Sequence, residues 1–319
     1  MTKSFPSLIP CDDINEALQF FTKRLGFRVD MIVPADSPVA AVISGHGLSI
    51  RLEKSGAPVK DEESVVIDEE ATGPKSSTIS SGDWVTGRAG MQYRDLIPGR
   101  MNGRVIASHI RIVNGGVVPD YVHYHKIIFQ MIYCKSGWIR VVYEDQGPPF
   151  ILNAGDCVLQ PPEIRHRVLG ASAGAEVVEI GCPAIHETWA EHEIKLPTAQ
   201  VLPDRDFGGQ HFVRHIAAEA VWEPSEIDGL DSRDTGISAA TNGLGNVRVL
   251  RPSDRLQIPN TVIKNSGGFL FFFVLNGEFS LDMQVKLNKD DAFAMQPGVD
   301  HSFLPSADLE LLEVSIPYV

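Results

Sequence analysis

Two histidines, His123 and His125, stand one residue apart in the stretch "PDYVHYHKIIFQMIYCKSG" at residues 119–137. The apolar run behind them indicates β-structure. Because residues one apart on a strand project from the same face, both imidazoles are expected to point the same way. Imidazole is the commonest metal ligand among side chains, and two at this spacing would make half of a metal site. The alternative is two histidines that share a strand face without a metal, since the other ligands must come from elsewhere in the chain.

The composition argues against nucleic-acid and membrane partners. The chain has 319 residues, of which 43% are hydrophobic and 22% charged, with a formal net charge of −13. Polyanionic partners need basic patches, and the sequence has no run of Lys or Arg. The most apolar run, "FLFFFVL" at residues 269–275, is too short for a membrane span and suits a buried strand. The length predicts two or three domains.

The cysteines and the start of the chain predict a cytoplasmic protein. Four widely spaced cysteines without a CxxC pair indicate reduced thiols rather than a disulfide framework. Acidic residues follow the first Met too early for a signal peptide. Cys134 and Cys157 lack an obvious activating base, which favours buried thiols over nucleophiles.

Residues 1–56 form a unit of one strand, one helix and three strands. Asp12 and Asp13 precede apolar residues at helical spacing, and Gly26 ends the helix. The runs "FRVDMIV", "VAAVIS" and "LSIRLE" predict the three strands. This order, with "LGFRVD" directly after the helix, resembles one module of the glyoxalase/bleomycin-resistance (vicinal oxygen chelate) superfamily. The resemblance implies ligands on the first and last strands, but only Glu53 qualifies, which favours a structural or dimerising unit.

Residues 57–90 are acidic and rich in Ser, Gly and Pro, which predicts a linker. Beyond them, short strands separated by turn residues predict β-barrels or sandwiches. This β region is duplicated. Residues 152–169 align with residues 287–304, and residues 175–183 align with residues 309–317, with Gly137 opposite Gly277 upstream of both.

The β region resembles a bicupin over roughly the last two-thirds of the chain. The first cupin motif is matched by Gly116, His123, His125, Gln130 and Gly137, and the second by Gly155, Pro161 and His166. The resemblance implies a mainly β fold of two cupin (double-stranded β-helix, jelly-roll) barrels. A metal-binding barrel is expected at residues 91–197 and a degenerate one at residues 198–319.

The resemblance also implies a metal site. Its ligands would be His123, His125, Gln130 and His166, with Gln130 on the next strand across a hairpin and His166 on the opposite side of the barrel. One divalent transition metal is expected, with Fe(II) favoured and Mn(II), Ni(II), Cu(II) and Zn(II) open. Gln130 stands where cupins carry Glu, so the site keeps more positive charge and is expected to bind an anionic small molecule.

Other histidines are assigned no metal role. The stretch "IHETWAEHE", with His186 and His192, is interpreted as a solvated helix face, and the remaining ones have packing or surface roles: His109, His211 and His215. The second barrel is expected to hold no metal, because His301 is its only histidine of the motif. Opposite the first-barrel ligands the repeat has Ile263, Asn265 and Leu270.

Gentisate-type ring-cleaving dioxygenases resemble this layout, with a three-His iron site in one of two barrels. The resemblance implies Fe(II)-dependent dioxygenation of a small aromatic or enolic acid. A non-catalytic small-molecule-binding or sensory cupin, and a redox-neutral Zn cyclase or isomerase, are the alternatives. The lone N-terminal module leaves a sheet edge unpaired, which predicts a homodimer or a contact with the cupin surface.

Overall fold

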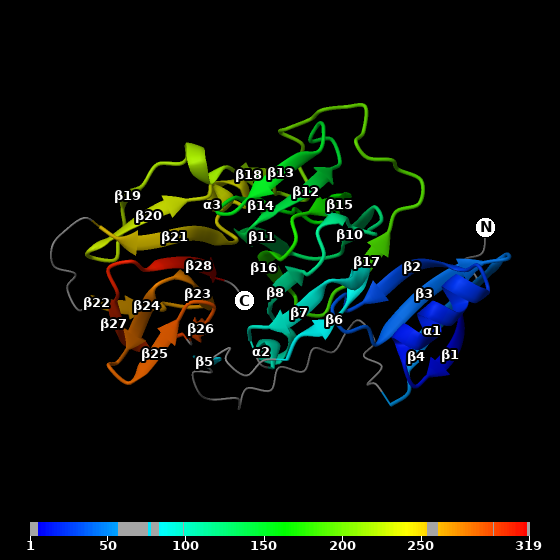
Figure 1. Cartoon of the computed structure of the whole chain (residues 1–319), viewed down its shortest axis with the longest axis horizontal. Coiled ribbons are helices and arrows are strands. Elements are labelled where there is room, and N and C mark those ends of the chain that lie inside the picture. Colours follow the sequence, from blue (N-terminus) through cyan, green and yellow to red (C-terminus); the bar gives the residue numbers. More distant parts are fainter. Residues whose placement is uncertain are drawn as a thin grey trace.

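The computed structural model describes residues 6–56, 76–77, 83–97, 99–253, 261–295 and 297–317. The chain is mainly β, as predicted, and the strands within these described residues form four sheets. Figure 1 shows three parts along the long axis: a blue N-terminal module at one end, a cyan-to-green barrel in the middle, and a yellow-to-red barrel at the other end. Most of the predicted linker lies outside the described residues, and the domain limits drawn from the sequence stay a prediction.

The N-terminal module has the expected order of elements. These are β1 (Ser7–Cys11), α1 (Ile14–Gln19), a π-helical turn (Phe20–Arg24), β2 (Arg28–Val33), β3 (Ala40–Gly45) and β4 (Leu48–Lys54). The Asp13 carboxylate caps α1 by accepting from the backbone amides of Asn15 and Glu16, at 2.8 and 3.0 Å. Gly26 follows the helix with a φ of +71°, which glycine adopts without strain. β1 pairs in parallel with β4, and α1 covers a small apolar core on one face of the sheet.

Two sheets enclose the first barrel. One has the order β1-β4-β3-β2-β17-β10-β15-β12-β13, with β9 beside β15, and the other the order β18-β14-β11-β16-β8-β7-β6. The bounds are β6 (Val85–Thr86), β7 (Gln92–Asp95), α2 (Arg100–Gly103), β8 (Ile106–Ile112), β9 (Gly116–Val117), β10 (His123–His125), β11 (Phe129–Ser136), β12 (Trp138–Tyr143), β13 (Phe150–Asn153), β14 (Cys157–Leu159), β15 (His166–Ala171), β16 (Ala175–Cys182), β17 (Thr188–Ala190) and β18 (Val213–His215). The N-terminal sheet therefore continues into the barrel through the pairing of β2 with β17.

The second barrel repeats the first. Its sheets run β19-β20-β21-β28-β23-β26-β5 and β22-β27-β24-β25. The bounds are β5 (Ser76–Ser77), β19 (Glu223–Pro224), β20 (Leu230–Asp234), α3 (Ile237–Ala240), β21 (Asn246–Pro252), β22 (Thr261–Lys264), β23 (Phe269–Asn276), β24 (Glu278–Leu281), β25 (Val285–Asn288), β26 (Ala292–Met295), β27 (Asp300–Pro305) and β28 (Glu310–Ile316). The pairing of β11 with β16 shifts register between Cys134 and Ser136, and that of β23 with β28 shifts between Val274 and Asn276. The same irregularity at the same place agrees with a duplicated barrel.

Each barrel takes a short strand from the segment that precedes the other. β18 precedes the second barrel but pairs with β14 of the first, where His215 lies opposite Cys157. β5 precedes the first barrel but pairs with β26 of the second, where Ser77 lies opposite Ala292. The exchange joins the barrels through backbone hydrogen bonds as well as through side-chain packing.

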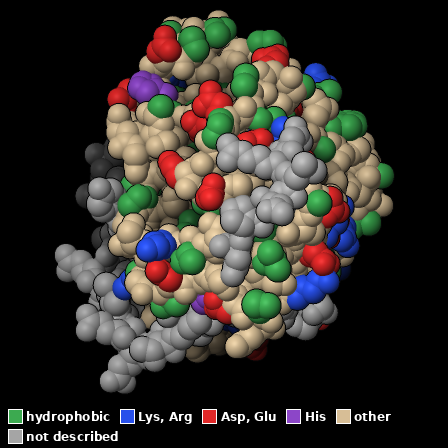
Figure 2. Space-filling view, turned by 90° about the vertical axis from the view of Figure 1, so that its left-hand side faces the viewer, with side chains coloured by type: hydrophobic (Ala, Val, Ile, Leu, Met, Phe, Trp, Pro, Cys, Tyr) green, Lys and Arg blue, Asp and Glu red, His purple; other side chains and the backbone are tan. Residues whose placement is uncertain are grey.

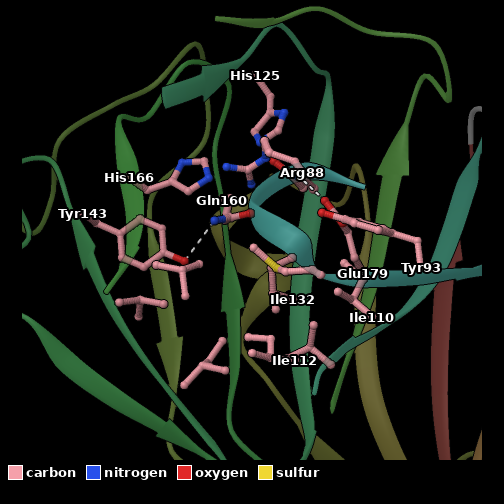
Figure 3. Close-up of a pocket in the computed structure, with 16 residues that line it drawn as sticks. Arg88, Tyr93, Ile110, Ile112, His125, Ile132, Tyr143, Gln160, His166 and Glu179 are labelled. Carbon is pink, nitrogen blue, oxygen red and sulfur yellow. Dashed lines mark hydrogen bonds between the residues drawn. The ribbon is translucent and has the colours of Figure 1, made fainter. Parts of the chain in front are cut away.

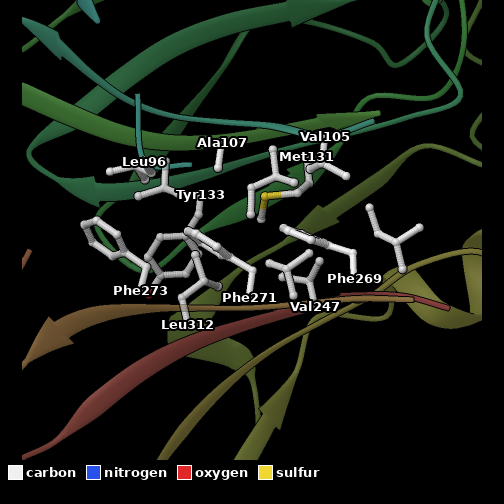
Figure 4. Packing of buried hydrophobic residues seen from close by; sticks show 14 of the residues in the cluster. Leu96, Val105, Ala107, Met131, Tyr133, Val247, Phe269, Phe271, Phe273 and Leu312 are labelled. Atoms are coloured by element: carbon white, nitrogen blue, oxygen red, sulfur yellow. The ribbon is translucent and has the colours of Figure 1, made fainter. Parts of the chain in front are cut away.

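The two barrels share one apolar core. Side chains of β11 and β8 pack against side chains of β21, β23 and β28, as Figure 4 shows. Met131 and Tyr133 approach from the first barrel, and Phe269, Phe271 and Phe273 from the second. Alternate residues of β23 point to this shared core because side chains on a strand alternate between its faces. The packing is tight: a Cβ at Gly245 would come within 2.4 Å of the Phe129 ring.

The end of the molecule formed by the second barrel has a mixed surface. Figure 2 shows hydrophobic, acidic and basic side chains interspersed over the described part of that face. Opposite charges that alternate over a surface largely cancel at a distance, so this face gives no electrostatic support for a polyanionic partner. Within the described residues, no helix is long and apolar enough to cross a membrane.

The shared core should dominate the stability of the barrel pair. Phe271 is fully buried in it, at 0% exposure. Phe271→Ala should lower the free energy of unfolding by about 3–5 kcal/mol, because it removes a large apolar contact and leaves a cavity. Val262→Ala, at a strand position that is 51% exposed, is the control and should change it by less than about 0.5 kcal/mol. Urea unfolding followed by fluorescence measures both, and equal small effects would contradict a core shared by both barrels.

Candidate metal centre

The three predicted histidines lie together inside the first barrel. His123 and His125 belong to β10, and His166 opens β15. These strands are neighbours in one sheet, with His123 directly opposite His166 and their ring centroids 4.2 Å apart. The prediction that His166 comes from the opposite side of the barrel is therefore wrong. Adjacent strands deliver all three rings, and the backbone pairing of β10 with β15 sets their spacing.

Each imidazole is held through its Nδ1 atom. The Nδ1–H groups of His123 and His166 donate to backbone carbonyls two residues earlier in the chain, at 2.8 and 2.9 Å. Because a carbonyl only accepts, these bonds place the proton on Nδ1 and the lone pair on Nε2. The Nδ1 of His125 lies 2.9 Å from the Thr188 hydroxyl. One ligand nitrogen from each ring lies within 4.8 Å of the other two.

The residues fit a divalent metal ion. The Nε2 of His123 is buried and, within the described part of the chain, has no hydrogen-bond partner. A buried polar atom without a partner is costly, and a metal ion would use its lone pair. Partners that fix the far nitrogen of each ring are the usual surroundings of histidine ligands. The cluster therefore has the donor atoms, the tautomers and the burial that a divalent metal needs.

Burial keeps the three imidazoles uncharged. It lowers the pKa of His123 and His125 well below the usual value, and the neighbouring imidazoles and the Arg88 guanidinium lower them further. For His166, burial lowers the pKa to about 4, although the Ile164 carbonyl opposes the shift. A neutral imidazole is the form that binds metal, so these rings need not lose a proton at neutral pH.

A cavity of about 70 Å³ opens beside the cluster. A volume of this size holds roughly five water molecules or one small organic ligand. Figure 3 shows that its walls differ in polarity: His125, His166, Arg88 and Gln160 lie at one end, and isoleucines such as Ile112 at the other. The arrangement suits a ligand with one polar end and one apolar end.

Gln130 lines this cavity from β11, in the sheet opposite the histidines. It does not follow β10 in a hairpin, as the sequence analysis expected, because the chain crosses from one sheet to the other between the two strands. Its side-chain amide donates to the Glu179 carboxylate at 2.5 Å, which leaves its carbonyl oxygen as the donor atom for a metal. Coordination by Gln130 stays a prediction. Burial raises the pKa of Glu179, against the opposing effects of Gln130 and Arg88.

Arg88 brings a positive charge to the polar end of the cavity. Its side chain is 13% exposed and forms an ion pair with the buried carboxylate of Asp120. That carboxylate also accepts from the Val168 amide at 3.0 Å, which fixes its position in the barrel wall. The Nε of Arg88 is buried without a hydrogen-bond partner among the described residues. Arg88 thus has an unused donor beside the histidine cluster.

Several other predicted residues lie away from this centre. The Glu53 carboxylate accepts from Arg51 at 2.6 Å within the N-terminal module. Trp138 and Arg140 of β12, for which the sequence leaves a substrate contact and a surface position equally open, are exposed. The thiols of Cys134 and Cys157 are buried, which raises the pKa of both, that of Cys134 to about 12. Neither thiol is therefore ionised at neutral pH.

The interpretation of His186 and His192 as a helix face is wrong. This segment contains the strand β17, which lies between β2 and β10. The His186 ring packs 5.3 Å from the ring of His125, and His192 pairs with Asp30 of the N-terminal module at 3.0 Å. Strand pairing from both sides overrode the helical spacing of the sequence.

His301 and the remaining histidines carry structural contacts. In the second barrel, the Nδ1 of His301 lies 2.6 Å from the Asp282 carboxylate, and Ile263 occupies the position opposite it. The side chain of Asn265 donates to two backbone carbonyls, at 2.8 and 3.2 Å. His109 is hydrogen-bonded to the Glu176 carboxylate at 2.9 Å, His215 is buried in β18, and His211 contacts the Arg205 carbonyl.

Three residues of the centre were missed by sequence reasoning: Arg88, Thr188 and Glu179. A sequence signal existed only for Glu179, because a charged residue inside the apolar strand "AEVVEIGC" predicts a buried carboxylate. Arg88 falls in the segment interpreted as linker, and Thr188 in the segment interpreted as helix. Neither position belongs to the cupin motif that identified the histidines.

Two solved structures resemble this fold. The oxalate decarboxylase of Lactobacillus farciminis, in a formate complex, aligns with a TM-score of 0.55 and 11% identity over 80% of this chain and 89% of that one. The protein Ylba from E. coli aligns with a TM-score of 0.51 and 12% identity over 77% of this chain and 88% of that one. No family model and no curated protein matches the sequence.

These alignments define the class of fold and leave the activity open. The chain has the fold of cupin barrels, mainly β, with a three-His cluster that suits a divalent metal in its first barrel. Identities near 11% carry no substrate and no reaction from one protein to another.

The first prediction for this site concerns metal content. The purified protein should bind about one divalent metal per chain, because the described residues contain one set of converging ligands. His123→Ala or His125→Ala should abolish binding. His301→Ala, the matched change in the second barrel, should leave it intact. Metal analysis after dialysis measures each case. Loss of metal in His301→Ala would show that the site was assigned to the wrong barrel.

A second prediction concerns pH. Ordinary imidazoles compete with protons below about pH 6.5, so a site of three would lose affinity by about tenfold per pH unit for each histidine. Here burial lowers the pKa of all three rings, that of His166 to about 4. Metal affinity should therefore be nearly equal at about pH 7.5 and about pH 5.5. Competition with a chelator measures it, with circular dichroism to verify the fold, and a thousandfold loss would contradict the lowered pKa values.

Proposed function

We propose that this chain is a metal-dependent cupin enzyme that acts on a small organic acid. The observation that carries the proposal is the convergence of three uncharged histidines, each held at Nδ1, at the polar end of a cavity. A purely structural metal is normally enclosed by its ligands, whereas a catalytic one faces a cavity. The cavity beside the cluster therefore favours an enzyme over a non-catalytic binder.

The residues of the barrel would have separate roles in metal and substrate binding. His123, His125 and His166 would hold the ion through Nε2, with the Gln130 carbonyl as a fourth donor. A bound Fe(II) ion would supply Lewis acidity and redox chemistry toward O₂. Because Gln130 is neutral, the donor set adds no negative charge, and an anionic substrate would balance the ion.

The shape and polarity of the cavity favour an aromatic or enolic acid. Its acidic group would meet Arg88 and the metal, and its carbon skeleton would lie among the isoleucines at the other end. A fully polar diacid would leave that apolar end without contacts. We propose Fe(II)-dependent dioxygenation of such an acid as the reaction.

A redox-neutral reaction is the second candidate, and Glu179 favours it. This carboxyl lines the cavity, and burial raises its pKa, so it keeps a proton more readily than an exposed glutamate. A protonated acid beside the substrate would donate to a developing carbanion or enolate. An isomerase, a cyclase or a decarboxylase comparable to the Lactobacillus farciminis protein would use such a group, with Zn(II) or Mn(II) in place of iron.

We also propose a glyoxalase-like origin for the N-terminal module and a homodimeric assembly. The order of its elements, strand, helix and three strands, supports the first proposal. The second rests on β1, which ends the sheet and carries the exposed apolar side chains Leu8 and Ile9, at 59% and 37% exposure. An edge strand of this kind is a site for pairing between chains.

The test of the proposed function is metal analysis of anaerobically purified protein, followed by turnover assays. The iron-loaded protein should consume oxygen with gentisate, a catechol or a β-diketone. Conversion of an acid without oxygen uptake, by the Zn or Mn form, would support the redox-neutral candidate instead. A metal-loaded protein that binds these acids and converts none would be a binding protein.

Arg88 provides the mutational prediction. Arg88→Met keeps the length of the side chain but removes its charge and its free donor, so the affinity for formate should fall by roughly ten- to a hundredfold. Metal content should stay unchanged. The control, Arg140→Met, removes an exposed arginine from the outer face of the same barrel. Titration of formate into the Co(II)-loaded protein, followed by the visible spectrum, measures both, and equal affinities would remove Arg88 from the site.

A further inference from the structure

The N-terminal module is one strand away from a metal-ligand strand. β17 pairs with β2 of the module on one side and with β10 on the other. Thr188 of β17 lies opposite Ile32 and also opposite His125. Thr188 is buried, at 1% exposure, and its hydroxyl lies 2.9 Å from the His125 Nδ1. The module therefore supports the strand that fixes one of the three rings.

A loop of the module also lies against the turn that carries Arg88. This β2–β3 loop, residues 34–39, places the Asp36 carbonyl where a Cβ on Gly87 would come within 3.2 Å of it. On its other side, the same Cβ would meet the Tyr93 ring at 2.7 Å. Gly87 thus fits between the loop and a residue of the cavity wall, and Arg88 follows it directly in the chain.

The loop is itself tied to the barrel by charge. The Asp36 carboxylate forms an ion pair with Arg100 in α2, and Arg100 also contacts Asp95 at the end of β7 at 3.1 Å. The backbone amide of Gly87 donates to the Met91 carbonyl at 2.9 Å and closes the turn that holds Arg88. These contacts place the loop, the turn and the edge of the barrel in one packed layer.

Arg88 lies in the loop of the β6–β7 hairpin, at the edge of its sheet. It belongs to a short 3₁₀ turn, Arg88–Gly90, between two strands that pair at Thr86 and Gln92. Its guanidinium forms an ion pair with Asp120, and one of its terminal nitrogens lies 3.4 Å from the His123 Nδ1. The paired strands fix the ends of the turn and the Asp36 loop packs against it beside Gly87, so both contribute to the position of Arg88.

We propose that the N-terminal module is a working part of the metal pocket, in which the loop around Asp36 positions Arg88 for binding the substrate anion. The inference rests on the proposed function, because it assigns to Arg88 the recognition of an acidic group. The barrel alone holds the metal through residues of β10 and β15. Asp36 is a positioning residue, which acts through the Gly87 turn and touches neither metal nor substrate.

The proposal predicts that the affinity for formate falls while the affinity for cobalt does not. A general loss of structure would lower both affinities together. In the full-length Co(II)-loaded protein, Asp36→Ala releases the loop from Arg100. The affinity for formate should fall on the order of tenfold, since small misplacements of a binding group are costly. Cobalt content and the spectrum of the formate-free protein should stay as in the wild type. Asp36→Glu, which can still pair with Arg100, should recover most of the affinity.

A second variant reaches the same turn by another route. Gly87→Ala inserts a Cβ between the Asp36 carbonyl and the Tyr93 ring, so it should weaken formate binding to a similar extent. Asp30→Ala is the matched control: it breaks the Asp30–His192 pair, which also joins the module to the barrel, but lies apart from the Gly87 turn. Its affinity for formate should equal that of the wild type.

The outcomes are distinguishable. Asp36→Ala and Gly87→Ala proteins that bind formate as tightly as the wild type would overturn the positioning role. An equal loss in Asp30→Ala would overturn it as well, because the effect would then reflect a loosened module and not the loop. A wild-type protein that takes up cobalt but no formate would contradict the proposed function, and this inference with it.

Discussion

Three uncharged imidazoles packed together in the barrel interior are the constraint on which the rest of the first barrel depends. Placing polar rings in an interior is unfavourable unless each nitrogen has a partner. Two backbone carbonyls and the Thr188 hydroxyl serve the Nδ1 atoms, and the pairing of β10 with β15 brings the Nε2 atoms together. Both neighbours of β10 take part in the site: β15 contributes the His166 ring, and β17 contributes the Thr188 hydroxyl.

The second barrel shows what the same framework does without that constraint. Ile263 lies opposite His301, as His123 lies opposite His166, and the interior is filled by apolar side chains. The repeat also retains a buried glutamate, Glu313, which pairs with Arg248 on the adjacent strand at 2.7 Å. In the first barrel that adjacent position is Ser108, so the equivalent Glu179 has no cation directly opposite it on β8.

This difference explains the partners of Glu179. Without an arginine beside it, the carboxyl turns to the Gln130 amide, and the nearest positive charge comes from Arg88 on a segment outside the sheets. A buried carboxyl stabilised by a neutral amide keeps a raised pKa and stays available to the cavity. In the second barrel, by contrast, the glutamate at the same position, Glu313, forms an ion pair with Arg248. At the matched positions the first barrel has two more histidines than the second and lacks the arginine opposite its glutamate, and it contains a three-His cluster beside a cavity where the second barrel is packed.

The sequence was sufficient for the parts of the fold that depend on local pattern and on spacing. Strand alternation placed His123 and His125 on one face, the repeat revealed both barrels, and Asp13 and Gly26 bounded the first helix. It failed where neighbours are chosen in three dimensions. Motif spacing does not state which strands pair, so His166 was expected across the barrel, and the segment around Thr188 was interpreted as helix although two strands flank it.

Arg88 is a candidate binding residue that could not be predicted from the sequence for the same reason. Arg88 follows an acidic segment rich in Ser, Gly and Pro, and such a composition predicts a linker. Composition alone does not reveal that other residues pack against one turn of that segment. Besides the histidines and apolar side chains, the barrel lines the cavity with neutral amides, two tyrosines and Glu179. The positive charge that an anionic ligand would meet comes from Arg88, on the turn between β6 and β7. A residue on a short turn is placed by its contacts, and for Arg88 these include the paired strands β6 and β7, Asp120 inside the barrel and the Asp36 loop beside Gly87. In the proposed site, separate parts of the chain would hold metal and anion: the paired strands of the barrel would hold the ion, and a turn that the N-terminal module contacts would bind the acid.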